Sequence, residues 1–374
     1  MSGIYIHIPF CHHKCTYCDF YFSVNARTLN GVVEGILKEI EERQNYLDTK
    51  KIESIYFGGG TPSILSVQHF EKIFNQLKKY FYWDDVEITV ECNPEDVSKE
   101  YFSDLKSLGV NRISLGMQSL NDKVLQWMGR KHSAEQSLRS LKILDQVGIE
   151  NFSVDIIFGV PEYDSKELEK DLRKLLSISR IPHISAYQLT VEKKTKLNYL
   201  VRTKKINLKT EDEVSEEFLR IQSILLEKNY QHYEVSNYAL NGYIAKHNSA
   251  YWLQKNYLGV GPSAHSYNGK ERRWNLANNY LYLNKIKNGE VYFEKEVLSE
   301  KQKFNEYVLT RLRTMYGCNI NEIELMFGEN YKKHFLNIYE KFKTCFEVEE
   351  KKTYRLKISE GYLLADKISG EFFV

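Results

Sequence analysis

The first half of the chain alternates between strand-like and helix-like segments, and this alternation restricts the folds open to it. Short apolar or alternating segments predict six strands, at 3–8, 52–57, 87–91, 112–116, 152–158 and 184–189. Helical patterns lie between them at 29–46, 68–80, 99–108, 134–146 and 166–176. Repeated strand–helix units form parallel sheets with right-handed crossovers. Six units within about 190 residues therefore predict an α/β fold, a partial (β/α)6 barrel short of the usual eight units.

Several of these strands carry polar residues on one face only. In the first strand, isoleucines alternate with Tyr5 and His7, and in the fifth, apolar residues alternate with Ser153 and Asp155. Because successive side chains in a strand point to opposite faces, each polar set shares one face. We expect the apolar sets to pack on the helices and the polar sets to line the lumen of the barrel. The alternative is an antiparallel sheet of amphipathic strands with one face exposed to solvent, and the intervening helices argue against it.

The length of 374 residues exceeds one ordinary domain. We expect a core at 1–225, with its barrel at about 1–190, a connecting region at 226–298 and a C-terminal domain at 299–374. Helical patterns followed by a short hairpin make the last part mainly helical and winged-helix-like.

Composition limits the partners and the location. A net charge of +2 gives no reason to expect nucleic acid. The chain shows no apolar run of about 20 residues that would span a bilayer, and no signal-peptide pattern. A cytoplasmic protein, with at most peripheral membrane contact, is the expectation.

Three of the six cysteines, Cys11, Cys15 and Cys18, lie within eight residues directly after the first strand. Barrel active sites lie at that end of the strands. A fully protein-bound [4Fe–4S] cube takes four ligands, so three cysteines leave one iron open to an external chelator. A zinc site completed by His7, His12 or His13 is the alternative. Clustered cysteines also favour a reducing compartment over a disulfide framework.

Further polar residues follow the other strands on the same side of the predicted barrel. Gly58–Gly59–Gly60–Thr61–Pro62 follows the second strand, and glycines let backbone N–H groups approach a ligand closely. Glu91, Gln118, Arg130 and Asp155 lie on or after later strands. Taken alone, Glu91 or Asp155 is consistent with a structural ion pair, and Arg130 with a solvated surface charge. Their shared position favours one ligand site.

The segment from Tyr5 to Cys11 (YIHIPFC), with Cys15 and Cys18, resembles the radical S-adenosylmethionine (SAM) family of oxygen-independent coproporphyrinogen III oxidases and their relatives. The resemblance covers most of the chain. It implies a [4Fe–4S] cluster on the three cysteines and an electron donor for that cluster. It also implies SAM binding by Tyr5, Tyr17, Gly59, Gly60, Thr61, Glu91, Gln118, Arg130 and Asp155.

Within this family the chain resembles heme chaperones more than the decarboxylases. The decarboxylases have a further cysteine where this chain has Phe20, and an extension before the first strand, which here begins at Gly3. His247–Trp252 (HNSAYW) matches an HNxxYW motif that is associated with heme binding. The resemblance thus implies a heme site at His247, Tyr251 and Trp252, and delivery of heme to respiratory cytochromes or similar hemoproteins.

Other interpretations remain open from the residues themselves. His247 also fits a core histidine beside two aromatic residues, and His265 and Cys318 are further candidate heme ligands. An oxidative decarboxylase of coproporphyrinogen III and a zinc-stabilised interaction protein are the alternative functions. Whether the chain turns over a substrate is not decided by the sequence.

Overall fold

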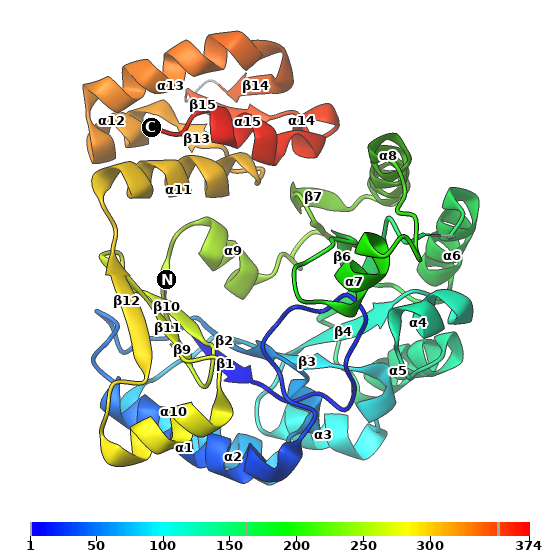
Figure 1. Ribbon diagram of the computed structural model, residues 1–374, viewed down its shortest axis with the longest axis vertical. Helices are drawn as coiled ribbons and strands as arrows, with labels where there is room; N and C mark the ends of the chain where they lie inside the picture. The colour runs from blue at the N-terminus through cyan, green and yellow to red at the C-terminus, as the bar shows by residue number, and fades with distance from the viewer. Residues whose placement is uncertain (1, 162, 350–351) are drawn as a thin grey trace.

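A single mixed sheet runs through the larger part of the molecule (Figure 1) and contains 12 strands of the described chain. The computed structural model describes residues 2–161, 163–349 and 352–374. The parallel centre of the sheet, in spatial order, consists of β9 (Asn256–Val260), β1 (Ser2–Ile8), β2 (Ser54–Gly59), β3 (Glu87–Cys92), β4 (Arg112–Gln118), β5 (Phe152–Phe158) and β6 (His183–Gln188). The six strands expected from the sequence are present and pair in chain order, so the predicted partial barrel is confirmed.

Amphipathic helices cover the outer face of this sheet (Figure 1). They are α1 (Leu29–Glu42), α2 (Val67–Tyr80), α3 (Lys99–Ser107), α4 (Asp122–Met128), α5 (Ala134–Val147) and α6 (Ser165–Ile178). In α2, the apolar side chains three and four residues apart face the sheet, and Phe70 packs on Phe57 of β2 with ring centroids 4.9 Å apart. A capping box between Ser133 and Gln136 begins α5, and Gly148, at φ 69°, ends it.

The two faces of the strands divide as the alternation predicts. Ile4, Ile6 and Ile8 are at most 1% exposed and belong to the main core. On the opposite face of other strands, Ser114 and Asp155 line a cavity inside the barrel. The lumen interpretation is therefore confirmed, and the antiparallel alternative is excluded by the parallel pairing of β1 to β6.

The segment between 190 and 298, in which the sequence pattern indicates no helix or strand, is regular in the structure. It forms helices and strands that extend the sheet at both edges. Its helices are α7 (Lys196–Arg202), α8 (Glu211–Glu227), α9 (Lys246–Trp252) and α10 (Asn279–Asn288), and its further strands are β7 (Gln231–Glu234), β8 (Asn237–Ala239), β10 (His265–Tyr267), β11 (Glu271–Asn275) and β12 (Phe293–Val297). Strands of three to five residues are too short to show a clear period of two.

The C-terminal part is mainly helical with a small sheet, as the sequence predicts, and lies across α9 from the barrel (Figure 1). Its elements are α11 (Glu300–Leu312), β13 (Cys318–Asn319), α12 (Ile320–Phe327), α13 (Glu329–Phe342), β14 (Phe346–Glu349), β15 (Thr353–Leu356), α14 (Glu360–Leu363) and α15 (Ala365–Glu371). Backbone hydrogen bonds join it to the β7–β8 hairpin, from Val235 to Arg313 at 3.0 Å and from Met315 to Tyr233 at 2.9 Å. The exact domain boundaries stay a prediction.

In the parts of the chain that the structure describes, no helix is both long and apolar enough to span a bilayer.

A buried carboxylate fastens α1 to the extension of the sheet. Glu39 is fully buried and accepts hydrogen bonds from Arg43 at 2.8 Å, Gly261 at 2.8 Å, Asn275 at 2.8 Å and Tyr282 at 2.7 Å. A buried charge is tolerated when donors replace its lost hydration. This network thus fixes β9, β11 and α10 against the first helix of the barrel.

We expect Tyr282→Phe to lower the free energy of unfolding of the apoprotein by about 1.5–3 kcal/mol, because it removes a hydrogen bond to a buried charged group. Chemical denaturation measures the change. Tyr238→Phe is the matched control, since the Tyr238 hydroxyl is buried and has no hydrogen-bond partner among the described residues. Equal stability of the two variants would contradict a role for the Glu39 network.

Candidate functional site

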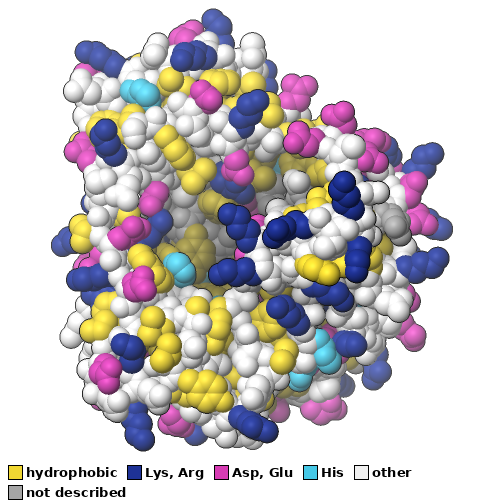
Figure 2. All heavy atoms as spheres, in the orientation of Figure 1, with side chains coloured by type: hydrophobic (Ala, Val, Ile, Leu, Met, Phe, Trp, Pro, Cys, Tyr) yellow, Lys and Arg dark blue, Asp and Glu magenta, His cyan; other side chains and the backbone are white. Residues whose placement is uncertain are grey.

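A cavity of about 690 Å³ opens at the carboxyl ends of the parallel strands. Its walls come from the cysteine loop, from the ends of β2 to β6 and, in the C-terminal part, from Arg313 directly after α11 and from α14 and α15. Figure 2 shows a hollow between the barrel and the C-terminal part, with hydrophobic side chains inside it and cationic side chains near its edge. The cavity is therefore shared by the two parts of the molecule.

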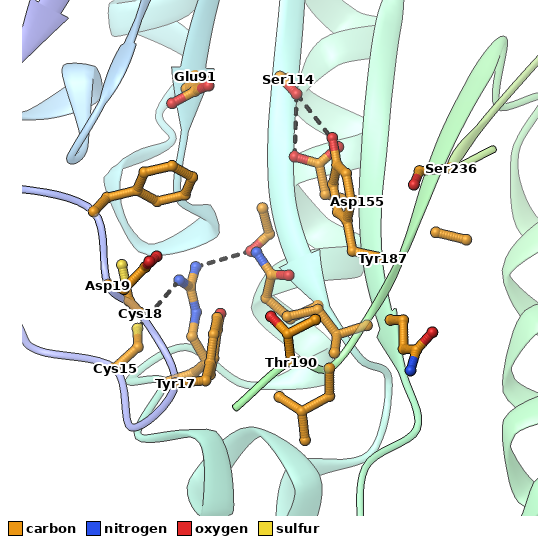
Figure 3. Close-up of a pocket in the computed structure, with 18 of the residues that line it drawn as sticks. Cys15, Tyr17, Cys18, Asp19, Glu91, Ser114, Asp155, Tyr187, Thr190 and Ser236 are labelled. Carbon is orange, nitrogen blue, oxygen red and sulfur yellow. Dashed lines mark hydrogen bonds between the residues drawn. The ribbon is translucent and has the colours of Figure 1, made fainter. Parts of the chain in front are cut away.

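Cys11, Cys15 and Cys18 all line this cavity. Figure 3 shows Cys15 and Cys18 close together on their loop, with Tyr17 between them in the chain. Burial raises the pKa of Cys11 to about 12 and that of Cys18 to about 11. Thiols bind metals as thiolates, so metal loading here would release protons.

Two side chains donate toward these sulfurs. The Thr61 hydroxyl lies 3.4 Å from Cys11 Sγ, and Arg130 Nη1 lies 3.7 Å from Cys15 Sγ. Hydrogen bonds to cluster sulfurs and ligand thiolates are a usual means of tuning iron–sulfur sites, so the donor set fits an iron–sulfur cluster. Across the described stretches, no three His, Cys, Asp or Glu side chains are already arranged around a common metal position. Cluster ligation by the three cysteines therefore stays a prediction.

The histidines proposed as a fourth zinc ligand are engaged elsewhere. His7 Nδ1 lies 3.1 Å from the Tyr5 hydroxyl, and His7 Nε2 lies 3.2 Å from the carbonyl oxygen of Tyr21. His12 pairs with Asp96 at 3.0 Å. Zinc ligation by His7 or His12 would break these contacts, while His13 lines the cavity with the cysteines.

The glycine turn after β2 brings backbone close to the cysteine loop. Gly59 has φ 109°, in the region that favours glycine, and a Cβ there would lie 2.5 Å from the His7 ring. A Cβ on Gly60 would lie 2.5 Å from the carbonyl oxygen of Phe10. A larger residue at Gly59 would displace the His7 ring of β1, and one at Gly60 would displace the backbone at the start of the cysteine loop. Gly59, Gly60 and Thr61 all line the cavity.

Two half-buried carboxylates face the cavity from strands β3 and β5 (Figure 3). Glu91 accepts hydrogen bonds from the Tyr56 hydroxyl at 2.7 Å and from the Gly59 N–H at 3.2 Å, and burial raises its pKa to about 7. Asp155 accepts from Ser114 at 3.1 Å and from Ser153 at 3.2 Å, and burial raises its pKa too. Both groups can accept from the hydroxyl or ammonium groups of a ligand.

Arg130 brings a cation to the same cavity. It donates to Asn93 Oδ1 at 2.6 Å and to the Gly116 carbonyl at 2.9 Å, while its buried Nε has no partner in the described chain. Gln118, whose amide and the Arg130 guanidinium both approach Gly116, lies at a bulge between β4 and β5, with φ 64°. A non-glycine residue held in the left-handed region is typical of functional sites. The cavity thus offers a cation and two carboxylates to one polar ligand.

Tyr17 lines the cavity, whereas Tyr5 is outside its described lining. The Tyr5 ring lies one layer deeper and stacks on Tyr56, with centroids 6.1 Å apart. In this arrangement, Tyr5 therefore does not reach a ligand in the cavity.

The three candidate heme residues lie on α9, away from the cavity lining. His247 is 3% exposed; its Nδ1 lies 2.8 Å from Ser54 Oγ and its Nε2 lies 2.9 Å from the Tyr251 hydroxyl. Burial lowers the pKa of His247 to about 3. Heme ligation by His247 would thus require one of these hydrogen bonds to break and α9 to move. Trp252 contacts Arg313, whose guanidinium carbon lies 5.4 Å from the centre of the indole ring.

The other candidate heme ligands differ in access. His265 is exposed on β10 and stacks on Trp274 at 6.3 Å, whereas Cys318 is fully buried in the C-terminal part. Of the histidine and cysteine candidates, His265 is the one that this conformation leaves open to solvent.

Comparisons with known proteins identify the family. The Radical SAM superfamily matches residues 5–175. A protein named heme chaperone HemW from Lactococcus lactis is 34% identical over 334 residues, which cover 89% of this chain and 86% of that protein. The chain belongs to the HemN-like radical SAM family, close to HemW. A Bacillus subtilis protein of the same name is 29% identical over 377 residues and covers 100% of this chain and 99% of its own.

The solved structure of Escherichia coli HemN, described as a coproporphyrinogen III oxidase and radical SAM enzyme, has the same fold. Its TM-score is 0.85 at 19% identity, over 100% of this chain and 90% of that one. Members of the radical SAM family use SAM and a [4Fe–4S] cluster. The cavity of this family member therefore lies where those two groups are expected.

Several residues of the cavity were not anticipated from the sequence. Tyr56 lies on the lumenal face of β2, and the alternation of that strand contains a signal for it. Ser114, in contrast, belongs to the polar face of β4 that the alternation predicts. Asn93, which holds Arg130, directly follows β3. Arg313 reaches the cavity only because the C-terminal part docks on the barrel, and no local pattern indicates this.

We expect Cys11→Ala, Cys15→Ala or Cys18→Ala each to abolish the cluster after anaerobic reconstitution, because two thiolates cannot hold the cube. Iron and acid-labile sulfide contents measure the loss. Cys345→Ala is the control, as Cys345 is outside the cavity lining and half-buried in the C-terminal part. Full iron content in any one of the three variants would contradict the ligand assignment.

We expect Asp155→Asn to weaken SAM binding about tenfold to a hundredfold while iron content stays unchanged, because one charge-assisted hydrogen bond is lost. Anaerobic titration of the reconstituted protein gives the affinity. Asp145→Asn, an exposed site on α5, makes the same charge change elsewhere. An unaltered affinity in Asp155→Asn would remove this carboxylate from the SAM site.

Proposed function

We propose that this protein is a cytoplasmic heme chaperone that binds a [4Fe–4S] cluster, SAM and heme and delivers heme to respiratory cytochromes or similar hemoproteins. The observation that carries the proposal is the likeness, at 34% identity over 89% of this chain, to a protein named heme chaperone HemW. Relatives with the same name from Haemophilus influenzae and Escherichia coli are 34% and 35% identical over 270 residues each.

In this proposal Cys11, Cys15 and Cys18 hold the cluster at the mouth of the barrel. Arg130 and the half-buried Glu91 and Asp155 bind and orient SAM by their opposite charges. In radical SAM chemistry a reduced cluster supplies an electron that cleaves SAM, and an external electron donor is therefore part of the proposal. The donors to sulfur from Thr61 and Arg130 support the thiolate form of the ligands.

Heme is proposed to bind through α9, with Tyr251 and Trp252 as aromatic contacts and His247 as the iron ligand. The hydrogen bonds of His247 to Ser54 and Tyr251 make this ligation conditional on movement of α9. His265 is the accessible alternative ligand on the sheet extension.

Oxidative decarboxylation of coproporphyrinogen III is the competing function within the family. Phe20 occupies the position where the decarboxylases carry a further cysteine; its side chain lines the cavity and is 68% exposed. A phenyl ring offers no ligand to metal and no redox chemistry at that position. This favours the chaperone over the decarboxylase.

We expect the reconstituted protein to bind heme in an anaerobic titration and to form no protoporphyrinogen from coproporphyrinogen III. His247→Ala should change the heme spectrum or weaken binding, whereas Cys15→Ala should keep heme. His265→Ala serves as the comparison that reports the alternative ligand. Failure of the wild-type protein to bind heme, or turnover of coproporphyrinogen III, would refute the proposed function.

A further inference from the structure

Helix α9 closes the lumen of the barrel at the end opposite the cysteine loop. The Glu87 carboxylate, at the start of β3, accepts hydrogen bonds from the backbone N–H groups of Lys246 and His247, each at 2.9 Å. At the start of β1, a Cβ on Gly3 would lie 3.3 Å from the His247 ring. These contacts, with Ser54 at the start of β2, place the first turn of α9 against the amino ends of three strands.

The His247 ring is joined to the cavity through one other side chain. It stacks on Tyr56 with centroids 5.0 Å apart and planes at 22°. Tyr56 also lines the cavity, and its hydroxyl donates to Glu91 Oε1 at 2.7 Å. Tyr5 stacks on the same Tyr56 ring, at 6.1 Å and 24°. Tyr56 is thus held within a stack of aromatic rings, and this stack orients its hydroxyl toward Glu91.

We propose that Tyr56 and His247 are positioning residues of the SAM site. They hold the Glu91 carboxylate in place from the side of the barrel that α9 closes. This rests on the proposed assignment of Glu91 to SAM and adds a role for α9 that is independent of heme. The stack fixes Tyr56, and Tyr56 supplies one of the two hydrogen bonds that Glu91 receives from the described residues, the other coming from the Gly59 N–H. Loss of His247 therefore loosens Tyr56, and loss of the Tyr56 hydroxyl leaves Glu91 with one donor.

The surroundings of Glu91 give the proposal a pH signature. Tyr56 faces it from β2, Asp155 from β5, Tyr5 from β1 and Tyr251 from α9. Burial and Asp155 raise the pKa of Glu91, while the Tyr56 hydrogen bond lowers it, with the balance at about 7. Removing the Tyr56 hydroxyl should raise this pKa further. A smaller fraction of Glu91 is then ionised at neutral pH, and binding that needs the carboxylate recovers only at higher pH.

The test is SAM affinity as a function of pH, measured on the anaerobically reconstituted protein. Tyr56→Phe keeps the ring and removes only the hydroxyl, so we expect about a tenfold loss of affinity near neutral pH. The pH midpoint of binding should move upward. His247→Leu should also weaken binding, and His247→Gln, which can still reach one polar neighbour, should restore part of it. Tyr238→Phe, a buried hydroxyl without a partner in the described chain, should bind SAM as the wild type does.

The outcomes separate this proposal from the proposed function. SAM affinity unchanged in both Tyr56→Phe and His247→Leu would overturn it. A loss that is equal at every pH, without recovery in His247→Gln, would also overturn it, because a general packing defect behaves in that way. A wild-type protein that binds SAM but not heme would refute the chaperone function and leave the positioning role intact.

Discussion

The lumen of this barrel holds carboxylates that are wholly or partly removed from water, and much of the surrounding structure follows from that. The period of two places Glu87, Glu91 and Asp155 on the inner face of the sheet. Burying an ion is costly unless hydrogen bonds replace its hydration. Each carboxylate therefore meets a dedicated donor set: helix N–H groups for Glu87, a tyrosine and a glycine N–H for Glu91, and serines for Asp155.

The cysteine loop is also held in place by hydrogen bonds, although its cysteines form no disulfide in the described chain. Backbone hydrogen bonds hold it from three directions. Cys11 N–H bonds to Ser23 at 3.1 Å, Thr16 N–H bonds to Met128 at 3.0 Å, and the Leu197 N–H bonds to Thr16 at 2.8 Å. The loop is thus positioned by its backbone, by α4 and by α7, and the sulfurs are left to face the cavity.

The sequence predicts those parts of the fold whose signal is local. Alternation in the first strands, the helical patterns between them and the cysteine spacing are all properties of neighbouring residues. The capping box of Thr210 and Glu213 is an equally local signal for α8 that the sequence interpretation missed. The parallel pairing of β9 with β1 is different in kind. It pairs five residues of β1 with five residues of β9 about 250 positions further along the chain, and no local pattern specifies such a pairing.

The HNxxYW segment illustrates how tertiary contacts decide the role of a motif. Residues four apart lie on one face of a helix, so His247 and Tyr251 share a face, and this face meets Ser54 and Tyr56 in the lumen. Trp252 is one residue further on, about 100° around the helix, and meets Arg313 on the C-terminal part. The spacing of the three residues therefore matches two separate packing surfaces of this fold. A heme ligand at His247 has to compete with contacts that already satisfy its ring, and the strength of those contacts sets how readily α9 can leave the barrel.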